Sequence, residues 1–299
     1  MLNSRPPFPG GLFFVCRPVQ PSFRSVCVRK SGHENTDCIL RREAAACREN
    51  RPDPCTGTGA ENLLRAVLRG RRGFLCPGGG AEHEVINDAN RNLVTFWEVL
   101  QKDFPALKRE IDATLHSRDA YRHALVVLEN PDMFDKVKTA WAVWTASNES
   151  YGHKWGAGFA YGRVCNMARK TARSREALTE ELAERIGSAV IECCDALRVI
   201  ESRDTPETLF YLDPPYPGTN QGMYDGYSQT DFENLLEVLS GCKGNFLLSS
   251  FRNGALDVYA RRFGWTQAEF KMHKSMTSSA RVKAQKIEVV TGNFPFATE

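Results

Sequence analysis

The chain of 299 residues lacks any apolar run long enough to cross a membrane, and it has little excess of charge. A membrane-spanning helix needs about 20 consecutive apolar residues, so the sequence predicts no membrane partner. The formal net charge of +3 permits nucleic acid binding but does not argue for it. The chain also lacks a C-x-x-C pair, and its cysteines show no zinc-ligand spacing with His33 or His83, so we expect no metal.

The first 80 residues lack a sustained amphipathic period and have an unusual composition. They contain 12 Arg but one Lys, 8 of the 15 Pro and 6 of the 10 Cys. A disulfide framework would require a secreted context, and eighty residues exceed what an Arg-rich transit peptide needs. Such a segment buries little apolar surface, so we expect residues 1–80 to be aberrant and disordered.

The most informative motif is Asp213-Pro214-Pro215-Tyr216. It follows a strand-like run over residues 208–212, and the two prolines end that strand at once. Open α/β sheets bind their ligands where strands end, so the tetrad is predicted to lie at a ligand site. A strand-terminating turn, in which the acid caps and the tyrosine packs, is the structural alternative.

The tetrad suits transfer of a group to a planar amine. The Asp213 carboxylate can accept one N–H of an exocyclic amine, and the Pro214 carbonyl can accept the other. The nitrogen lone pair then turns out of conjugation towards an electrophile held in line, which is catalysis by positioning. Pro215 stiffens that carbonyl further, and Tyr216 offers a face for base stacking, an interaction that contributes about 1–3 kcal/mol.

Periodicity predicts the elements on either side of this motif. From Asp88 to about Ser150 apolar residues recur at helical spacing, with Trp141 and Trp144 expected in the core. Residues 151–174, rich in Gly, Arg and aromatic side chains, are predicted to form a loop. Beyond the motif the pattern predicts a helix over 232–239, a strand over 245–250, a helix over 256–263 and a terminal hairpin. Strands interleaved with helices favour an α/β fold with a three-layer, Rossmann-like sheet.

Positive charge is concentrated in two stretches. Such runs could neutralise phosphates that flank a target base, and a solvated helix or loop face is the alternative. The first run consists of Arg163, Arg169, Lys170, Arg173 and Arg175, and the second of Lys271, Lys274, Arg281, Lys283 and Lys286.

The tetrad resembles the catalytic motif of Dam-like, adenine-specific DNA methyltransferases, which use S-adenosylmethionine. Residues 84–90 resemble the family's second strand, whose terminal acid, here Asp88, holds the cofactor ribose. Residues 190–196 resemble the next strand and its acid, here Asp195, placed for the adenine end of the cofactor. Residues 224–232 and 286–294 resemble the later loop, helix and closing hairpin, so the likeness covers about residues 81–296.

This resemblance implies a methyltransferase domain over residues 81–299, with a helical target-recognition insertion over about 100–187. Duplex DNA would bind across the basic loop and one adenine would be flipped out, at a cost of a few kcal/mol. Asp213 would lie against both base and cofactor. The implied DNA-binding residues are Arg163, Arg169, Lys170 and Arg173, with Tyr224 or Tyr227 closing the base pocket.

Two cofactor elements that the family places before residue 80 are missing from this reading frame. One is a Tyr-Gly-Gly-Lys-like start and the other a Pro-Phe-Cys-Gly-Gly-Gly-like turn. With suitable codons, residues 39–45 and 65–76 read from the second nucleotide give both motifs, in the expected order. We therefore interpret residues 1 to about 80 as out-of-frame translation, which would leave the sheet without its first strand and the cofactor without its cradle.

Other functions remain open on the sequence alone. The same tetrad could serve an RNA base or a protein glutamine, although relatives that modify glutamine usually carry Asn at the first position. An inactive frameshifted remnant that at most binds DNA is the non-enzymatic alternative. The resemblance favours a cytoplasmic enzyme of a bacterial, viral or mobile-element host, in the setting of restriction–modification, and it leaves the oligomeric state unknown.

Overall fold

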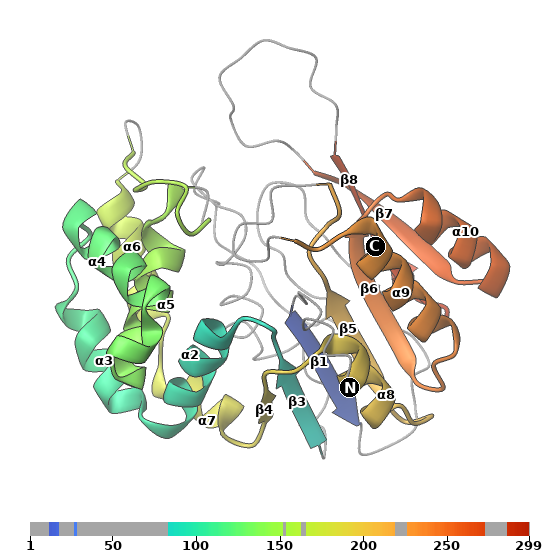
Figure 1. Cartoon of the computed structure of the whole chain (residues 1–299), viewed down its shortest axis with the longest axis horizontal. Coiled ribbons are helices and arrows are strands. Elements are labelled where there is room, and N and C mark those ends of the chain that lie inside the picture. Colours follow the sequence, from blue (N-terminus) through green and yellow to red (C-terminus); the bar gives the residue numbers. More distant parts are fainter. Residues whose placement is uncertain are drawn as a thin grey trace, which may run out of the picture. The chain divides into compact units, whose positions relative to one another are not determined.

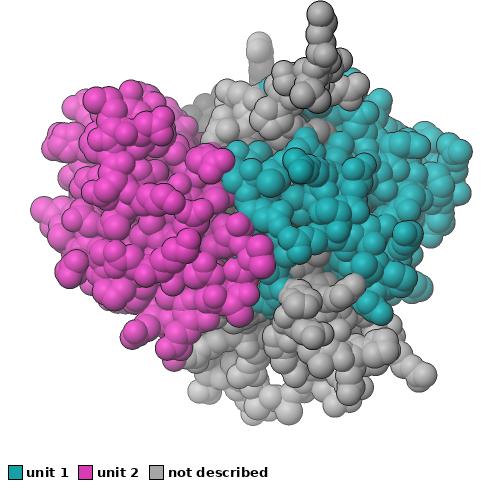
Figure 2. Space-filling model, turned by 60° about the horizontal axis from the view of Figure 1, so that its bottom comes forward, with its two compact units in different colours: residues 1–53, 72–89, 192–299 teal, residues 54–71, 90–191 magenta. Residues whose placement is uncertain are grey.

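The computed structural model describes residues 12–17, 27–28, 83–151, 154–162, 166–218, 226–272 and 286–298. The chain separates into two compact units, coloured in Figure 2. We call residues 90–191 the helical unit. The sheet unit comprises residues 83–89 and 192–298 together with two short N-terminal strands, β1 (Leu12–Arg17) and β2 (Cys27–Val28). The rest of the segment that we predict to be out of frame lies outside the described residues.

A seven-stranded mixed sheet forms the centre of the sheet unit, in the order β4-β3-β1-β5-β6-β8-β7 (Figure 1). β5 and β6 are parallel, whereas β8 is antiparallel to both of its neighbours. A second, two-stranded sheet pairs β2 with β9 (Ala297–Thr298). The other strands are β3 (His83–Asn87), β4 (Val190–Glu192), β5 (Leu209–Asp213), β6 (Asn245–Phe251), β7 (Thr266–Met272) and β8 (Lys286–Gly292).

The centre of the sheet holds a strand where we expected none. β1 lies between β3 and β5 and runs antiparallel to both. Leu12 pairs with Asp213, and the next residue, Phe13, pairs with Asn87. The ends of β3 and β5 therefore lie at the same edge of the sheet, one strand apart.

One face of this sheet packs against α8 (Ala196–Arg203), α9 (Gln229–Ser240) and α10 (Gly254–Phe263). Helices α9 and α10 confirm the two helices predicted after the tetrad. Alternate residues of the central strands face this core, among them Leu212 of β5 and Leu248 of β6. Because successive side chains of a strand point to opposite faces, the next residues, Asp213 and Ser249, lie on the other face.

The helical unit is built around α5 (Lys136–Glu149). Trp141 and Trp144 are 5% and 0% exposed, which confirms their prediction as core residues. The prediction of a loop over 151–174 is wrong for its last part, because α6 begins at Met167, where the Asn166 side chain caps the first turn. The other helices are α2 (Arg91–Lys102), α3 (Phe104–Ala113), α4 (Arg118–Glu129) and α7 (Glu180–Gly187), with a short 3-10 turn, η1 (Pro131–Met133).

Candidate active site

The tetrad lies where β5 ends, as the sequence predicts. Asp213 is the last residue of the strand and is exposed, whereas Pro214 and Pro215 are buried. The chain then turns at Gly218, whose φ of 72° is in the left-handed region. Two buried prolines thus hold an exposed acid at the edge of the sheet.

Tyr216 connects this acid to two later strands. Its hydroxyl donates to Oδ1 of Asp213 at 3.1 Å and lies 3.2 Å from Oγ of Ser249 in β6. It also lies 3.3 Å from Oε1 of Glu288 in β8, to which Ser249 donates at 2.7 Å. The ring packs at a tilt against Phe251, with centroids 4.3 Å apart. The side chain is therefore held from the sheet side by both its hydroxyl and its ring.

Burial raises the pKa of the Tyr216 phenol well above its usual range, and the nearby negative charge of Asp213 raises it further. The phenol stays protonated at neutral pH, so its hydroxyl remains a hydrogen-bond donor. A lasting donor next to the acid can fix the rotation of its carboxylate group.

The two acids predicted to hold the cofactor follow neighbouring strands. Asp88 comes directly after β3 and is fully buried, and its backbone N–H donates to the Glu192 carbonyl at 3.3 Å. Asp195 follows β4, and its Oδ1 accepts from the backbone N–H groups of Leu197 and Arg198, so that it caps α8. Their predicted interactions with a cofactor remain predictions, and the cap gives Asp195 a structural role as well.

Sequence reasoning missed Asn87, which ties these two strand ends together. Its side-chain amide donates to the Cys194 carbonyl at 3.1 Å, and its Oδ1 accepts from the Cys194 N–H at 2.9 Å. Asn87 is fully buried. This paired bond brings the acids after β3 and β4 to one place on the sheet edge, and only the position of Asn87 at the end of a predicted strand could have signalled it.

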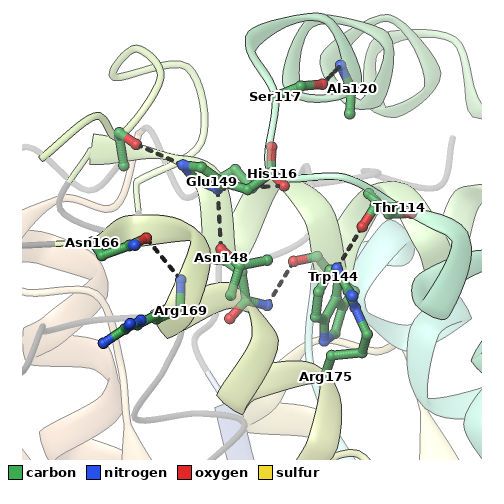
Figure 3. A network of polar contacts seen from close by, with 12 residues as sticks. Thr114, His116, Ser117, Ala120, Trp144, Asn148, Glu149, Asn166, Arg169 and Arg175 are labelled. Atoms are coloured by element: carbon green, nitrogen blue, oxygen red, sulfur yellow. Dashed lines mark hydrogen bonds and ion pairs between the residues drawn. The ribbon is translucent and has the colours of Figure 1, made fainter.

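In the helical unit, the basic candidates fall on α6. Arg169 and Arg173 are exposed and lie four residues apart, on one side of the helix, whereas Lys170 is half-buried. Arg175, from the same run, turns inward and donates to the Thr114 carbonyl (Figure 3). Arg175 therefore has a structural partner in the helical unit.

An exposed arginine outside the predicted runs belongs with these candidates. The Arg118 guanidinium lies 5.2 Å from the ring centroid of Phe159 and 5.9 Å from that of Tyr161, which is 62% exposed. Neither its spacing nor its neighbours in sequence mark Arg118, because its aromatic partners lie about 40 residues later in the chain.

Three other candidates are placed differently or not at all. Tyr227 is 4% exposed and belongs to the core between the sheet and its helices, which raises the pKa of its phenol. Its predicted role at a base pocket remains untested. Arg163 and Tyr224 lie outside the described residues, as does most of the second basic run.

Neither a metal cluster nor a membrane segment is found in the parts of the chain that the structure describes. No three His, Cys, Asp or Glu side chains there come together as ligands for an ion. None of the helices there is both long and apolar enough to cross a bilayer.

Comparison with known proteins identifies the family. Residues 78–259, more than half of the chain, match the model of the D12 class N6 adenine-specific DNA methyltransferases. None of the curated proteins compared with the chain matches it. The matched range contains the tetrad and both acids at the ends of β3 and β4. The chain therefore belongs to the D12 class of N6 adenine-specific DNA methyltransferases.

Proposed function

We propose that the chain transfers a methyl group from S-adenosylmethionine to the exocyclic amine of an adenine flipped out of duplex DNA. The observation that carries this proposal is the position of Asp213–Tyr216, an exposed acid on two buried prolines at the edge of the sheet. At such an edge an open α/β sheet binds its ligands.

The sheet supports a Rossmann-like methyltransferase domain. β3 and β5 are both antiparallel to β1, so they run in the same direction, and β6 continues that direction. Asp88 and Asp195 follow β3 and β4 in the chain, and Asp213 is the last residue of β5. In this arrangement a substrate and a cofactor can lie side by side across the edge.

The residues at the edge suit the proposed cofactor. When bound, S-adenosylmethionine supplies a methyl group on a positively charged sulfonium. Asp88 would accept hydrogen bonds from the ribose hydroxyls and Asp195 would lie near the adenine end. Asp213 places a negative charge beside the reacting centre. Opposite charges of this kind attract strongly where water is excluded.

The chain's own groups would position the target amine. Asp213 accepts one N–H and the Pro214 carbonyl accepts the other, so that the lone pair faces the methyl donor. Tyr216 keeps the acid in one rotation through its hydrogen bond to Oδ1. No covalent bond to the enzyme forms in this scheme, so Cys193 and Cys194 are not required as nucleophiles.

DNA recognition is assigned to the helical unit. Its exposed cations Arg118, Arg169 and Arg173 can bind phosphates, and Tyr161 exposes an aromatic ring beside the first of them. The predicted insertion, about residues 100–187, lies within this unit, which begins earlier, at Asn90.

Substitution of the acid tests the proposal. We expect Asp213→Ala to abolish methyl transfer while leaving the Kd for duplex DNA within about twofold, because the charge that orients the amine is removed and the phosphate-binding cations remain. Labelled methyl incorporation and fluorescence anisotropy measure the two quantities. Asp257→Ala, which removes a carboxylate on α10, is the control. Retained turnover in Asp213→Ala would overturn the assignment.

Two further comparisons separate the alternatives. Incorporation into RNA in preference to duplex DNA would select an RNA-base methyltransferase. DNA binding without any cofactor binding would select an inactive remnant. Both measurements use the full chain.

We also infer that the glycine motifs of the cofactor cradle lie in the shifted frame of the same gene. Reading the nucleotides before codon 81 tests this directly. If the motifs are there, the product with the frame restored should be assayed beside the present chain. Stop codons or unrelated residues in that frame would show that the N-terminal segment is genuine.

A further inference from the structure

We propose that Glu288 is a positioning residue for the methyl transfer, acting on Asp213 through the hydroxyl of Tyr216. The inference rests on the proposed function. Glu288 lies in β8, 75 residues after the catalytic acid in sequence, and is 6% exposed. Its carboxylate faces the same hydroxyl as Asp213 does, from the side of the sheet.

The hydrogen-bond distances indicate which of the two hydroxyls, Ser249 or Tyr216, donates and which accepts. Ser249 donates to Oε1 of Glu288 at 2.7 Å, the shortest of the four distances in the cluster, as expected for a hydroxyl bound to a carboxylate. The Ser249 hydroxyl has a single proton, which it donates to Glu288. Towards Tyr216, 3.2 Å away, Ser249 can only act as an acceptor.

The Tyr216 hydroxyl therefore becomes the donor in this cluster. Its acceptors are Oδ1 of Asp213 at 3.1 Å, Oγ of Ser249 at 3.2 Å and Oε1 of Glu288 at 3.3 Å. Two of these three lie outside the tetrad, on β6 and β8. The single phenolic proton is shared among these acceptors, so its hydrogen bond to Oδ1 of Asp213, the shortest of the three, depends on the competing carboxylate of Glu288.

Strand pairing makes this support rigid. Ser249 pairs with Val290, and Phe251 pairs with Glu288 in the antiparallel ladder of β6 and β8. Phe251 also packs against the Tyr216 ring. One pair of strands therefore supplies both the polar and the aromatic groups that hold Tyr216.

Replacing the Glu288 carboxylate by an amide should lower kcat and leave the binding of DNA and cofactor unchanged. We expect Glu288→Gln and Tyr216→Phe each to lower kcat by about 10-fold to 100-fold, since a hydrogen bond to a charged group is disturbed in both. The KM for DNA and the Kd for S-adenosylmethionine should stay within about twofold. Glu269→Gln, which neutralises an exposed glutamate on the adjacent β7, is the matched control.

The double variant Tyr216→Phe/Glu288→Gln tests whether Glu288 affects kcat only through the Tyr216 hydroxyl. Because Glu288 acts through the hydroxyl, its substitution should have no further effect once that hydroxyl is gone. The double variant should then match Tyr216→Phe in kcat. Effects on kcat that multiply, or wild-type kcat in Glu288→Gln, would overturn the proposal.

A readout that needs no turnover keeps this test separate from the proposed function. With tyrosine labelled at ¹³Cζ, the resonance that disappears in Tyr216→Phe identifies the phenol. We expect it to shift in Glu288→Gln and to stay in place in Glu269→Gln. An unmoved resonance would refute the hydrogen bond, whereas a shifted resonance in a protein without methyl transfer would support it and count against the proposed function alone.

Discussion

Two buried glutamates, Glu288 in the sheet unit and Glu149 in the helical unit, differ in whether their carboxyl groups find hydrogen-bond donors. Glu288 in the sheet accepts hydrogen bonds from Ser249 and Tyr216. Glu149, at the end of α5, is 0% exposed, and neither of its carboxylate oxygens finds a hydrogen-bond donor among the described residues. A bonded buried carboxylate can support a reactive neighbour, whereas an unbonded one costs stability.

The surroundings of Glu149 explain why it has no donor. The nearest ring nitrogen, Nδ1 of His116, is 3.6 Å from its Oε1, and this nitrogen lies closer, at 3.0 Å, to Oγ1 of Thr171. The other nitrogen, Nε2, carries a proton, because it lies 3.1 Å from the Ala160 carbonyl, which can only accept. Both ring nitrogens of His116 thus have partners, Thr171 and the Ala160 carbonyl.

Replacing each glutamate by leucine should give the largest contrast in stability between the two units. Glu288→Leu should lower the free energy of unfolding by about 1–3 kcal/mol, because the buried Ser249 hydroxyl loses its acceptor and the Tyr216 hydroxyl loses one of three. Glu149→Leu should leave it within about 1 kcal/mol or raise it, because an apolar group replaces a buried carboxyl group that lacks hydrogen-bond donors. Hydrogen exchange read by mass spectrometry reports the two units separately. A large decrease in the hydrogen-exchange protection of the helical unit in Glu149→Leu would show that Glu149 stabilises its unit and would contradict this comparison.

A second effect on stability is expected from a glycine in the sheet unit. A Cβ on Gly244 would lie 2.8 Å from the Thr208 carbonyl oxygen and 2.9 Å from that of Thr205, and these are backbone atoms that cannot swing away. Gly244→Ala should therefore cost about 1–3 kcal/mol of stability. Gly254→Ala is the matched control, since a Cβ there meets nothing within 4 Å. Equal melting temperatures of the two variants would contradict this tight packing.

The smallest expected effect concerns the DNA binding that we propose for the helical unit. Arg169→Ala/Arg173→Ala should weaken duplex binding severalfold and reduce the slope of log Kd against log salt by about 0.9 for each phosphate that is no longer neutralised. At saturating DNA, kcat should not change. Arg261→Ala, on α10 of the sheet unit, should leave both quantities at their wild-type values. A slope unchanged by the double substitution would place the DNA-binding surface elsewhere.

The parts of the fold that sequence could predict are those encoded locally. The strand before the tetrad, the helices after it and the buried tryptophans of α5 all follow from periodicity and from the two prolines. The start of α6 was missed because one capping side chain, Asn166, decides it. The inward turn of Arg175 was missed because its partner, Thr114, lies 61 residues away.

The supports of the site could not be predicted for the same reason. Tyr216 meets Ser249 and Glu288 across 33 and 72 residues of chain, and Asn87 meets Cys194 across 107. Such pairs depend on the order and register of strands, which local pattern does not specify. The motif predicts methyl transfer to an amine, and only the order of the strands in the sheet shows which side chains hold Tyr216 in place.

The most direct test of the central claim is the identity of the methylated base. Duplex DNA is incubated with the full chain and S-adenosylmethionine labelled in its methyl group, digested to nucleosides and analysed by mass spectrometry. We predict that the label appears as N6-methyladenine with the wild-type chain and is absent with Asp213→Ala. Label in another base, or equal label with both chains, would contradict the assignment of Asp213–Tyr216 as the site of adenine methylation.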